Sequence, residues 1–376
     1  MGNPFVLTVQ LKQHSPLIHF QSDQPGATLR ATELKPKLDK FLIAHTFKDN
    51  FEEYKRFLVE YDEKKYLQLK GNEKKDYEER IHKALDYKVK IRVDPGKVRT
   101  ESFSIITMKK TGVRYPLLTL EIFSLKPGLL DKIKEVIDDF FILHNFGLRQ
   151  SKGFGCFTTS DTTQDGFEKT ALIKYPVFYK KRTTVPNVFS EIDMDYKILK
   201  SGNNHNQYLK SELFRYFCGQ GQIAWEKRKI KETLKAKYPG VFNSLMHRGE
   251  NKGNRIATCD SDKKDPDYRY IRALLGLAEH NEFRTWQGKI QITIEDHKEE
   301  IERFQSPLMF KVFNQTIYIF PNEIPDAMFN RNFNFLLDDN NLFTIPTPKK
   351  DQFSMIEFLD FSLFKELKGW ERIPKK

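Results

Sequence analysis

Cysteine is scarce in this chain of 376 residues, which has only three. Cys156, Cys218 and Cys259 are widely spaced, so the sequence predicts neither a disulfide framework nor a paired CxxC zinc site. His205 and His247 do not stand at metal-ligand spacings from these cysteines, and no metal site is expected. Scarce cysteine also favours a reducing compartment, so we expect a cytoplasmic protein.

Long hydrophobic runs are missing as well. No stretch of about 18 consecutive apolar residues occurs, and the first residues do not combine a basic segment with an apolar one, as a signal peptide would. We therefore expect a soluble protein without a membrane partner. A hydrophobic fraction of 39% over 376 residues is enough for two cores of ordinary size.

No nucleotide-binding fingerprint is present, although the chain has one glycine-rich loop. Gly147, Gly153 and Gly155 stand between a predicted helix and a predicted strand. The dinucleotide fingerprint and the P-loop run in the opposite order, from strand to helix, so neither a nucleotide nor another cofactor is expected. Glycine lets the backbone approach a ligand closely, and we predict that these amides, with Arg149 and Lys152, contact phosphate. A solvated basic turn is the alternative.

Negative charge is in deficit, because 63 Lys and Arg residues against 51 Asp and Glu give a net charge of +12. A polyanion such as RNA is the first partner class to consider. Aromatic residues make up 13% of the chain and could offer stacking faces. Arg30, Lys35 and Lys37 follow a loop and open a predicted helix, where phosphate can also meet free amides. Ordinary surface charge is the alternative for these three residues.

The first half of the chain alternates strands and helices. Alternating residues predict a strand over 5–12, and an apolar face predicts a helix over 33–44 with Thr32 as its N-cap. Charged residues dominate 47–85, which we interpret as an exposed and peripheral helical insertion. Strands are also predicted over 87–93, 102–107 and 116–125, and a helix with apolar residues at spacings of three and four over 129–144.

The second half repeats this order. Strands are predicted over 171–178, 286–294 and 308–320, and helices over 207–217, 223–237 and 354–367. The order strand, helix, strands, helix, strand is that of a ferredoxin-like domain, whose sheet is also the RRM platform. We therefore predict an α+β protein with two tandem ferredoxin-like (RRM-like) domains, over 1–168 and 169–376. The second is diverged and has a helical insertion near 205–280.

The glycine-rich loop resembles that of the RAMP superfamily of CRISPR-associated proteins, which is basic and placed after the second helix of a ferredoxin-like domain. The loop lies in mid-chain, at 147–155. In this respect the chain is most similar to the first, tandem-domain subunit of the type III-B Cmr effector complex. Three further segments resemble parts of that subunit: PGATLRAT at 25–32, RALLGL at 272–277 and ERFQSPL at 302–308.

This resemblance implies a non-catalytic subunit of an antiviral ribonucleoprotein. Such a subunit holds CRISPR RNA and target RNA near the 3′ end of the guide, beside other Cmr subunits. The residues that we expect to contact RNA are Arg30, Lys35, Lys37, Gly147, Arg149, Gln150, Ser151, Lys152, Gly153 and Gly155.

Two other functions stay open at this point. RAMP ribonucleases attack with the ribose 2′-hydroxyl and need a general base, so His14 or His19 could serve a metal-independent endoribonuclease that processes CRISPR RNA. Asp23 precedes Arg30 in a loop where an acid supports metal-dependent cleavage in a related subunit, although a turn residue is the simpler interpretation. The chain could instead be a protein-binding scaffold in which the basic loop faces an acidic partner.

Overall fold

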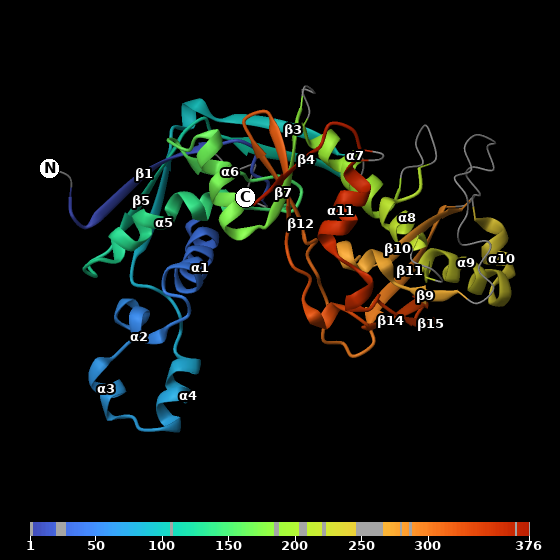
Figure 1. The fold of residues 1–376 in the computed structure, drawn as a ribbon, viewed down its shortest axis with the longest axis horizontal. Helices are drawn as coiled ribbons and strands as arrows, with labels where there is room; N and C mark the ends of the chain where they lie inside the picture. Colours follow the sequence, from blue (N-terminus) through green and yellow to red (C-terminus); the bar gives the residue numbers. More distant parts are fainter. Residues whose placement is uncertain are drawn as a thin grey trace. The chain divides into compact units, whose positions relative to one another are not determined.

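The computed structural model describes residues 3–19, 28–105, 108–183, 188–202, 209–219, 223–245, 266–278, 280–285, 288–364 and 367–375. The chain divides into two compact units, whose elements are labelled in Figure 1. The first unit consists of Met1–Pro176 with Lys311–Gln315, and the second of Val177–Phe310 with Thr316–Lys376. The predicted α+β class is confirmed, with sheets that are mainly antiparallel.

A four-stranded antiparallel sheet forms the centre of the first unit. Its strands, in spatial order, are β2 (Lys88–Val93), β5 (Leu118–Phe123), β1 (Val6–Gln13) and β6 (Phe157–Thr159). Along β5, Leu118, Leu120 and Ile122 are buried and alternate with more exposed residues, because successive side chains of a strand point to opposite faces. Helices α1 (Ala31–Phe41) and α5 (Leu129–Leu143) pack on the apolar face (Figure 1).

Helix α5 supplies the longest apolar stripe of the first unit. It begins after Gly128, whose φ of 80° suits a residue without a Cβ atom. Ile133, Ile137 and Phe140 follow at spacings of three and four and are buried in the core with the sheet and α1. The helix predicted over 129–144 is therefore confirmed, because its periodicity of about 3.6 residues matches the observed packing.

Helix α1 begins earlier than predicted. Arg30 is its N-cap residue, and Thr32 lies inside the first turn, so the N-cap prediction is wrong. Leu29 and Leu34 are buried on either side of this start, and their packing outweighs a cap worth about 1 kcal/mol. After its last turn, α1 continues as the π-helical turn Leu42–Thr46.

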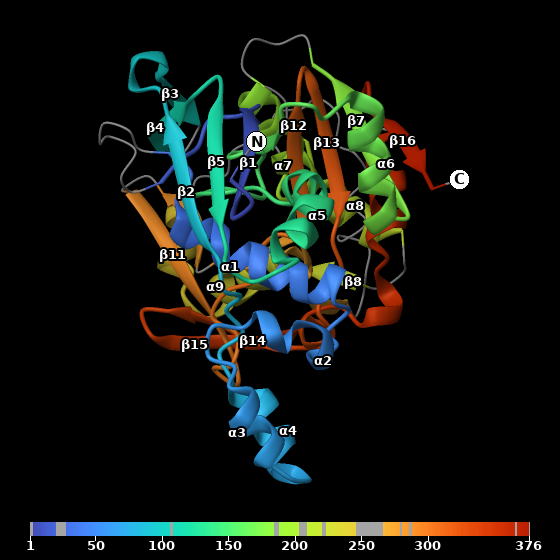
Figure 2. The same cartoon turned by 90° about the vertical axis from the view of Figure 1, so that its left-hand side faces the viewer.

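The charged segment 47–85 is helical, as predicted, but it is not merely peripheral. Its helices are α2 (Phe51–Tyr54), α3 (Glu63–Gln68) and α4 (Asn72–Arg80). Figure 2 shows α3 and α4 extending away from the strands. The side chains of this segment that are buried in the core of the first unit include Phe51, Tyr54, Phe57, Leu58 and Tyr66. Aromatic packing therefore fixes the insertion to the domain.

Three further elements complete the first unit. β3 (Arg99–Ile105) and β4 (Met108–Arg114) form an antiparallel ribbon between β2 and β5 in the sequence. Helix α6 (Gln164–Lys174) follows β6, with Thr163 as its N-cap. The strand predicted over 171–178 is thus wrong in its first half, because a capped helix occupies those residues.

A second sheet has the same strand order as the first. Its strands, in spatial order, are β12 (Leu308–Phe313), β13 (Thr316–Pro321), β7 (Val177–Arg182) and β16 (Glu371–Pro374). In both sheets the spatial order is therefore second, third, first and fourth strand of the chain segment. Helix α7 (Val188–Lys200) follows the first of these strands, and α11 (Met355–Leu363) precedes the last.

A third four-stranded sheet belongs to the second unit. Its strands are β10 (His280–Thr285), β11 (Gly288–Asp296), β14 (Asn332–Leu337) and β15 (Asn340–Pro346). The region predicted as a helical insertion contains α8 (Glu212–Cys218), α9 (Glu226–Lys237), α10 (Pro239–Ser244) and the parallel pair β8 (Ile223–Trp225) and β9 (Asp267–Arg269). It is therefore a mixed insertion, and the helix predicted over 223–237 begins with a short strand.

Two further features bear on the predictions from composition. Among the described residues, no helix combines the length and the apolar character that a membrane span requires. Cys156 is buried and free.

Replacing Phe140 with alanine should lower the free energy of unfolding by about 3–5 kcal/mol, because the change leaves a cavity under a fully buried ring. Leu125→Ala is the control, since Leu125 is 66% exposed, and a change below about 0.5 kcal/mol is expected there. Denaturant unfolding measures both values. An equally small effect for Phe140→Ala would contradict the packing of α5 described above.

Candidate functional site

The glycine-rich loop joins the end of α5 to β6 within the first unit. Gly147, Arg149, Gly153 and Gly155 all have positive φ, with values of 76°, 58°, 78° and 64°. Such conformations turn the backbone sharply, and they cost a residue with a side chain about 1–2 kcal/mol. The loop folds back on itself, so that the Phe146 amide donates to the carbonyl of Gly155 at 3.0 Å.

Close packing requires glycine at two of these positions. A Cβ atom on Gly155 would lie 1.9 Å from the carbonyl oxygen of Phe146, and one on Gly147 would lie 2.6 Å from that of Ile18. Both neighbours are backbone atoms, so no side-chain rotation can relieve the overlap. The glycines let the loop pack against the segment after β1, where the Gly155 amide donates to the carbonyl of Pro16 at 2.9 Å.

The amides of the other two glycines are also occupied. The Gly147 N–H donates to both carboxylate oxygens of Glu33, at 2.8 and 3.1 Å. The Gly153 N–H donates to the carbonyl of Gln150 at 3.3 Å. Each of the three N–H groups therefore has an acceptor within the chain. The glycines shape the loop, and their contact with phosphate stays a prediction.

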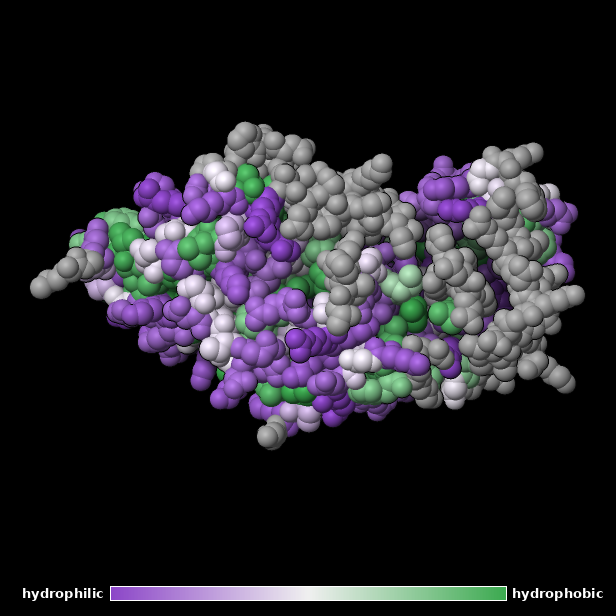
Figure 3. All heavy atoms as spheres, turned by 90° about the horizontal axis from the view of Figure 1, so that it is seen from above, coloured by the Kyte–Doolittle hydropathy of each residue, from purple (hydrophilic) through white to green (hydrophobic). Residues whose placement is uncertain are grey.

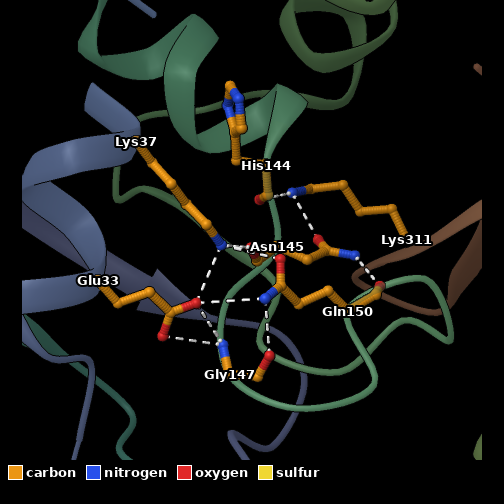
Figure 4. A network of polar contacts seen from close by, with 7 residues as sticks. All are labelled: Glu33, Lys37, His144, Asn145, Gly147, Gln150 and Lys311. Atoms are coloured by element: carbon orange, nitrogen blue, oxygen red, sulfur yellow. Dashed lines mark hydrogen bonds and ion pairs between the residues drawn. The ribbon is translucent and has the colours of Figure 1, made fainter. Parts of the chain in front are cut away.

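A carboxylate on α1 holds the loop in place (Figure 4). Besides the loop amide, Glu33 accepts hydrogen bonds from Lys37 Nζ at 2.9 Å and from Gln150 Nε2 at 3.3 Å. Lys37 Nζ also donates to the Asn145 carbonyl at 2.9 Å and to Gln150 Oε1 at 2.8 Å. An ammonium group has three donors, and all three are used here. Lys37 therefore has a structural role in the loop, and its predicted phosphate contact stays a prediction.

Gln150 is likewise committed to the loop. Its Nε2 donates to the Gly147 carbonyl at 2.8 Å, and its backbone carbonyl accepts from Asn145 Nδ2 at 2.7 Å. Its side-chain oxygen accepts the hydrogen bond from Lys37 Nζ that is described above. Both the oxygen and the nitrogen of this side-chain amide have hydrogen-bond partners inside the chain, and the RNA contact of Gln150 stays a prediction.

Lys35 is occupied on the boundary between α1 and the insertion. Its Nζ donates to Asp39 Oδ2 at 2.7 Å and to the Leu85 carbonyl at 2.8 Å, and it lies 4.3 Å from the centre of the Tyr87 ring. Burial raises the pKa of Asp39, and the hydrogen bond and charge of Lys35 act in the opposite direction. A partly buried carboxylate needs such a partner. The structure thus gives Lys35 partners inside the chain, and its RNA contact stays a prediction.

Lys311 reaches the loop from a distant part of the sequence, and sequence reasoning missed it. It is fully buried, and its Nζ donates to the carbonyls of Phe141 and His144 at 2.7 Å each and to Asn145 Oδ1 at 3.0 Å (Figure 4). The last carbonyls of a helix lack partners within it, so this ammonium group caps α5 and meets the negative end of its dipole. Burial lowers the pKa of Lys311 to about 8.

The remaining predicted contacts lie at the outer part of the loop and at the start of α1. Arg30, Arg149, Ser151 and Lys152 have partly exposed side chains. A hydrogen bond of 2.8 Å from the Lys152 amide to the Arg149 carbonyl closes the turn. The loop therefore carries two cations and a hydroxyl on one short, closed turn, with Lys152 Nζ and Arg149 Nε themselves buried.

Both candidate general bases of the described residues, His14 and His19, are partly or fully buried. His14 Nδ1 accepts from the Asn314 amide at 3.4 Å, so Nε2 carries the proton and donates to Thr158 Oγ1 at 2.8 Å. Burial lowers the pKa of His14 to about 3, which makes its ring a weak base. Burial also lowers the pKa of His19, and Asp23 lies outside the described residues. In the described part of the chain, no three His, Cys, Asp or Glu side chains are grouped to hold a metal ion.

Two family models match the chain. Residues 5–203 match the Cmr1 N-terminal domain, and residues 208–369 match the Cmr1 C-terminal domain. A search of curated proteins gives no match. Among solved structures, the chain is similar to the crystal structure of Cmr1 from Pyrococcus furiosus in its apo form, with 10% identity and a TM-score of 0.37 over 98% of each chain. It is also similar to a chain of the type III-B Cmr-beta bound to cognate target RNA, solved by cryo-EM, with 11% identity and a TM-score of 0.23 over 42% of this chain and 58% of that one.

Gly155→Ala should destabilise the protein on the order of 3 kcal/mol or more, because the new Cβ atom overlaps a backbone carbonyl. Gly128→Ala is the matched control. Gly128 also has a positive φ, but a Cβ atom there meets nothing within 4 Å, so only the conformational cost of about 1–2 kcal/mol is expected. Thermal unfolding of both variants measures the difference, and equal effects would contradict the close approach of the loop strands.

Lys311→Met should lower stability at pH 7 by about 1–3 kcal/mol, since it leaves buried carbonyl groups without a donor. The folded-state pKa of Lys311 is lowered to about 8 from 10.5, so the unfolded chain binds more protons between these values. The wild type therefore gains stability relative to the variant as the pH rises from 8 towards 10. Unfolding at several pH values checks this. A stability difference between wild type and variant that does not change with pH would contradict a buried Lys311 that titrates in this range. Lys350→Met, which removes a cation from an exposed ion pair, is the control.

Proposed function

Because this chain belongs to the Cmr1 family, as the two domain matches show, we propose that it is a non-catalytic, RNA-binding subunit of a type III-B CRISPR effector ribonucleoprotein. In this role it holds the backbone of CRISPR RNA and target RNA near the 3′ end of the guide. Its partners are the other Cmr subunits, its compartment is the cytoplasm, and no cofactor takes part.

The proposal includes a ferredoxin-like domain in each half of the chain. The first half runs β1, α1, β2, β5, α5, β6, and the second runs β7, α7, β12, β13, α11, β16. The shared spatial order of the strands in both sheets supports this assignment, because a split βαβ unit with two crossing helices gives that order. The ribbon, the helical insertion and the third sheet are additions between these elements.

The observation that carries the RNA-binding proposal is the basic turn between α5 and β6. Arg149 and Lys152 stand on it, and the Glu33 and Asn145 contacts fix the backbone on both sides. A turn that is ordered before binding loses little conformational entropy when it meets a ligand. Guanidinium and ammonium groups form strong, charge-assisted hydrogen bonds with phosphate oxygens. The net charge of +12 adds attraction for a polyanion at longer range.

A non-catalytic role is supported by the histidines of the first unit. The ring of His14 uses both nitrogens in hydrogen bonds within the chain and lies 4.7 Å from the ring of Phe313. A general base must be able to reach and accept the proton it abstracts. His14 is therefore a packing residue, and the ribonuclease alternative would depend on His19.

The Arg149→Ala/Lys152→Ala variant should bind single-stranded RNA more weakly and with less dependence on salt. Each phosphate contact adds about 0.7 to the slope of log K against log salt for a single strand, so the loss of two contacts reduces the slope by about 1.4. Fluorescence anisotropy in EDTA at several salt concentrations measures both quantities. Lys132→Ala/Lys134→Ala on α5 removes the same charge elsewhere and is the control.

Each other outcome points to a different function. Affinity and slope unchanged in the loop variant would favour a scaffold that presents the loop to an acidic protein. A denaturing gel of the same samples tests the remaining alternative. RNA that is cleaved in EDTA by the wild type but not by His19→Ala would replace the proposal with a metal-independent ribonuclease.

A further inference from the structure

One face of the sheet of the first unit, which we call the open face, carries the more exposed residues of strands β1, β2 and β5. Helices α1 and α5 pack on the apolar side, so the alternate positions of the strands point the other way. The residues of this open face are Lys88, Lys90 and Arg92 on β2, Thr119, Glu121 and Phe123 on β5, and Val6, Thr8, Gln10 and Lys12 on β1. A hydrogen bond of 3.2 Å from Thr119 Oγ1 to Gln10 Oε1 joins two strands across it.

The open face has a row of positive charge along its edge strand. Lys88, Lys90 and Arg92 recur at every second residue of β2 and are exposed, so successive cations are about 7 Å apart. Glu121 is the acidic residue of the face, and it pairs with Arg92 at 2.8 Å. Within the described part of the chain, neither Lys88 nor Lys90 has an ion-pair partner. A regular row of cations of this kind is complementary to a polyanion.

An aromatic ring stands beside this row. Phe123, on a central strand, is 39% exposed, and its register neighbours are Lys88 on one side and Val6 on the other. Phe5 is 46% exposed at the same end of the sheet, where its carbonyl accepts from the Ser124 amide at 3.1 Å. In the left part of Figure 3, small hydrophobic patches lie among hydrophilic side chains. Exposed rings on a sheet next to cations suit unpaired bases, which stack on the ring while phosphates meet the charges.

We propose that the open face is a second RNA-contact surface, which binds a short stretch of unpaired RNA. Phe123 stacks on a base, and Lys88 and Lys90 contact phosphates. This inference rests on the proposed RNA-binding function and adds a site to it. The site is separate from the glycine-rich loop, because Val6 and Gln13 are at opposite ends of β1, about 23 Å apart, and the loop packs beyond the Gln13 end.

The test uses the full chain and a fluorescent single-stranded oligouridylate in EDTA. Phe123→Leu keeps an apolar side chain but removes the stacking ring, and it should weaken binding about five- to a hundredfold. Phe123→Tyr keeps a ring and should bind like the wild type. Lys88→Gln/Lys90→Gln should reduce the salt slope by about 1.4, whereas the control Lys132→Gln/Lys134→Gln, on α5, should leave it unchanged.

Two further measurements make the result specific. The affinity for an RNA duplex should not depend on the ring at position 123, because paired bases cannot stack on it. Photo-crosslinking of RNA that contains 5-iodouridine should label the peptide with Phe123. Since these side chains are exposed, the unfolding midpoints of the variants should equal that of the wild type, which separates lost contacts from misfolding.

The outcomes also separate this inference from the function on which it rests. If Phe123→Leu and Lys88→Gln/Lys90→Gln bind like the wild type while Arg149→Ala/Lys152→Ala binds weakly, the open face is not a contact surface and the loop proposal stands. Equal losses for Phe123→Leu on single-stranded and duplex RNA would also overturn the stacking assignment. A wild type that binds no RNA would overturn both proposals.

Discussion

The position of the glycine-rich loop depends on the hydrogen bonds of one buried residue, Asn145. Its Oδ1 accepts from Lys311 and from the Cys156 thiol, its Nδ2 donates to the carbonyl of Gln150, and its own carbonyl accepts from Lys37. One residue thus connects the end of α5, the outer turn of the loop, the start of β6 and α1. A buried polar network is stable only when every member has its partner, so the position of the loop follows from this set of contacts.

The secondary structure could be predicted where the apolar residues follow one clear period. Buried residues at spacings of three and four place α5, and strict alternation places β5. The insertion over 47–85 shows the opposite case. Charged residues dominate its composition, yet Phe51, Tyr54 and Tyr66 are buried. A few large rings contribute more to packing than many solvated charges. The strand expected at 171–178 failed for a related reason, since a short apolar run does not distinguish a helix from a strand.

The site could be predicted in position but only partly in chemistry. A basic residue near a glycine loop looks the same in a sequence whether it meets phosphate or an internal carboxylate. Two signals were present, however, because Glu33 precedes Lys37 by four residues and Lys35 precedes Asp39 by four, the spacing of helical ion pairs. Lys311 also stands alone among apolar residues of β12, which is typical of a buried and partnered charge. Its partners could not be predicted, since they lie up to 170 residues away.

These contacts divide the cations of the first unit into two groups with different responses to salt. Lys37, which is partly buried, and Lys311, which is fully buried, donate to acceptors inside the chain, and salt screens such contacts only weakly. Lys88 and Lys90 face solvent, where their attraction for a polyanion is screened within about 10 Å at moderate salt. Rising salt should therefore release a bound polyanion while the loop keeps its shape. A reversible interface requires that the ligand dissociates at a lower salt concentration than the one that disrupts the loop, because the basic surface then releases its ligand without losing its own structure.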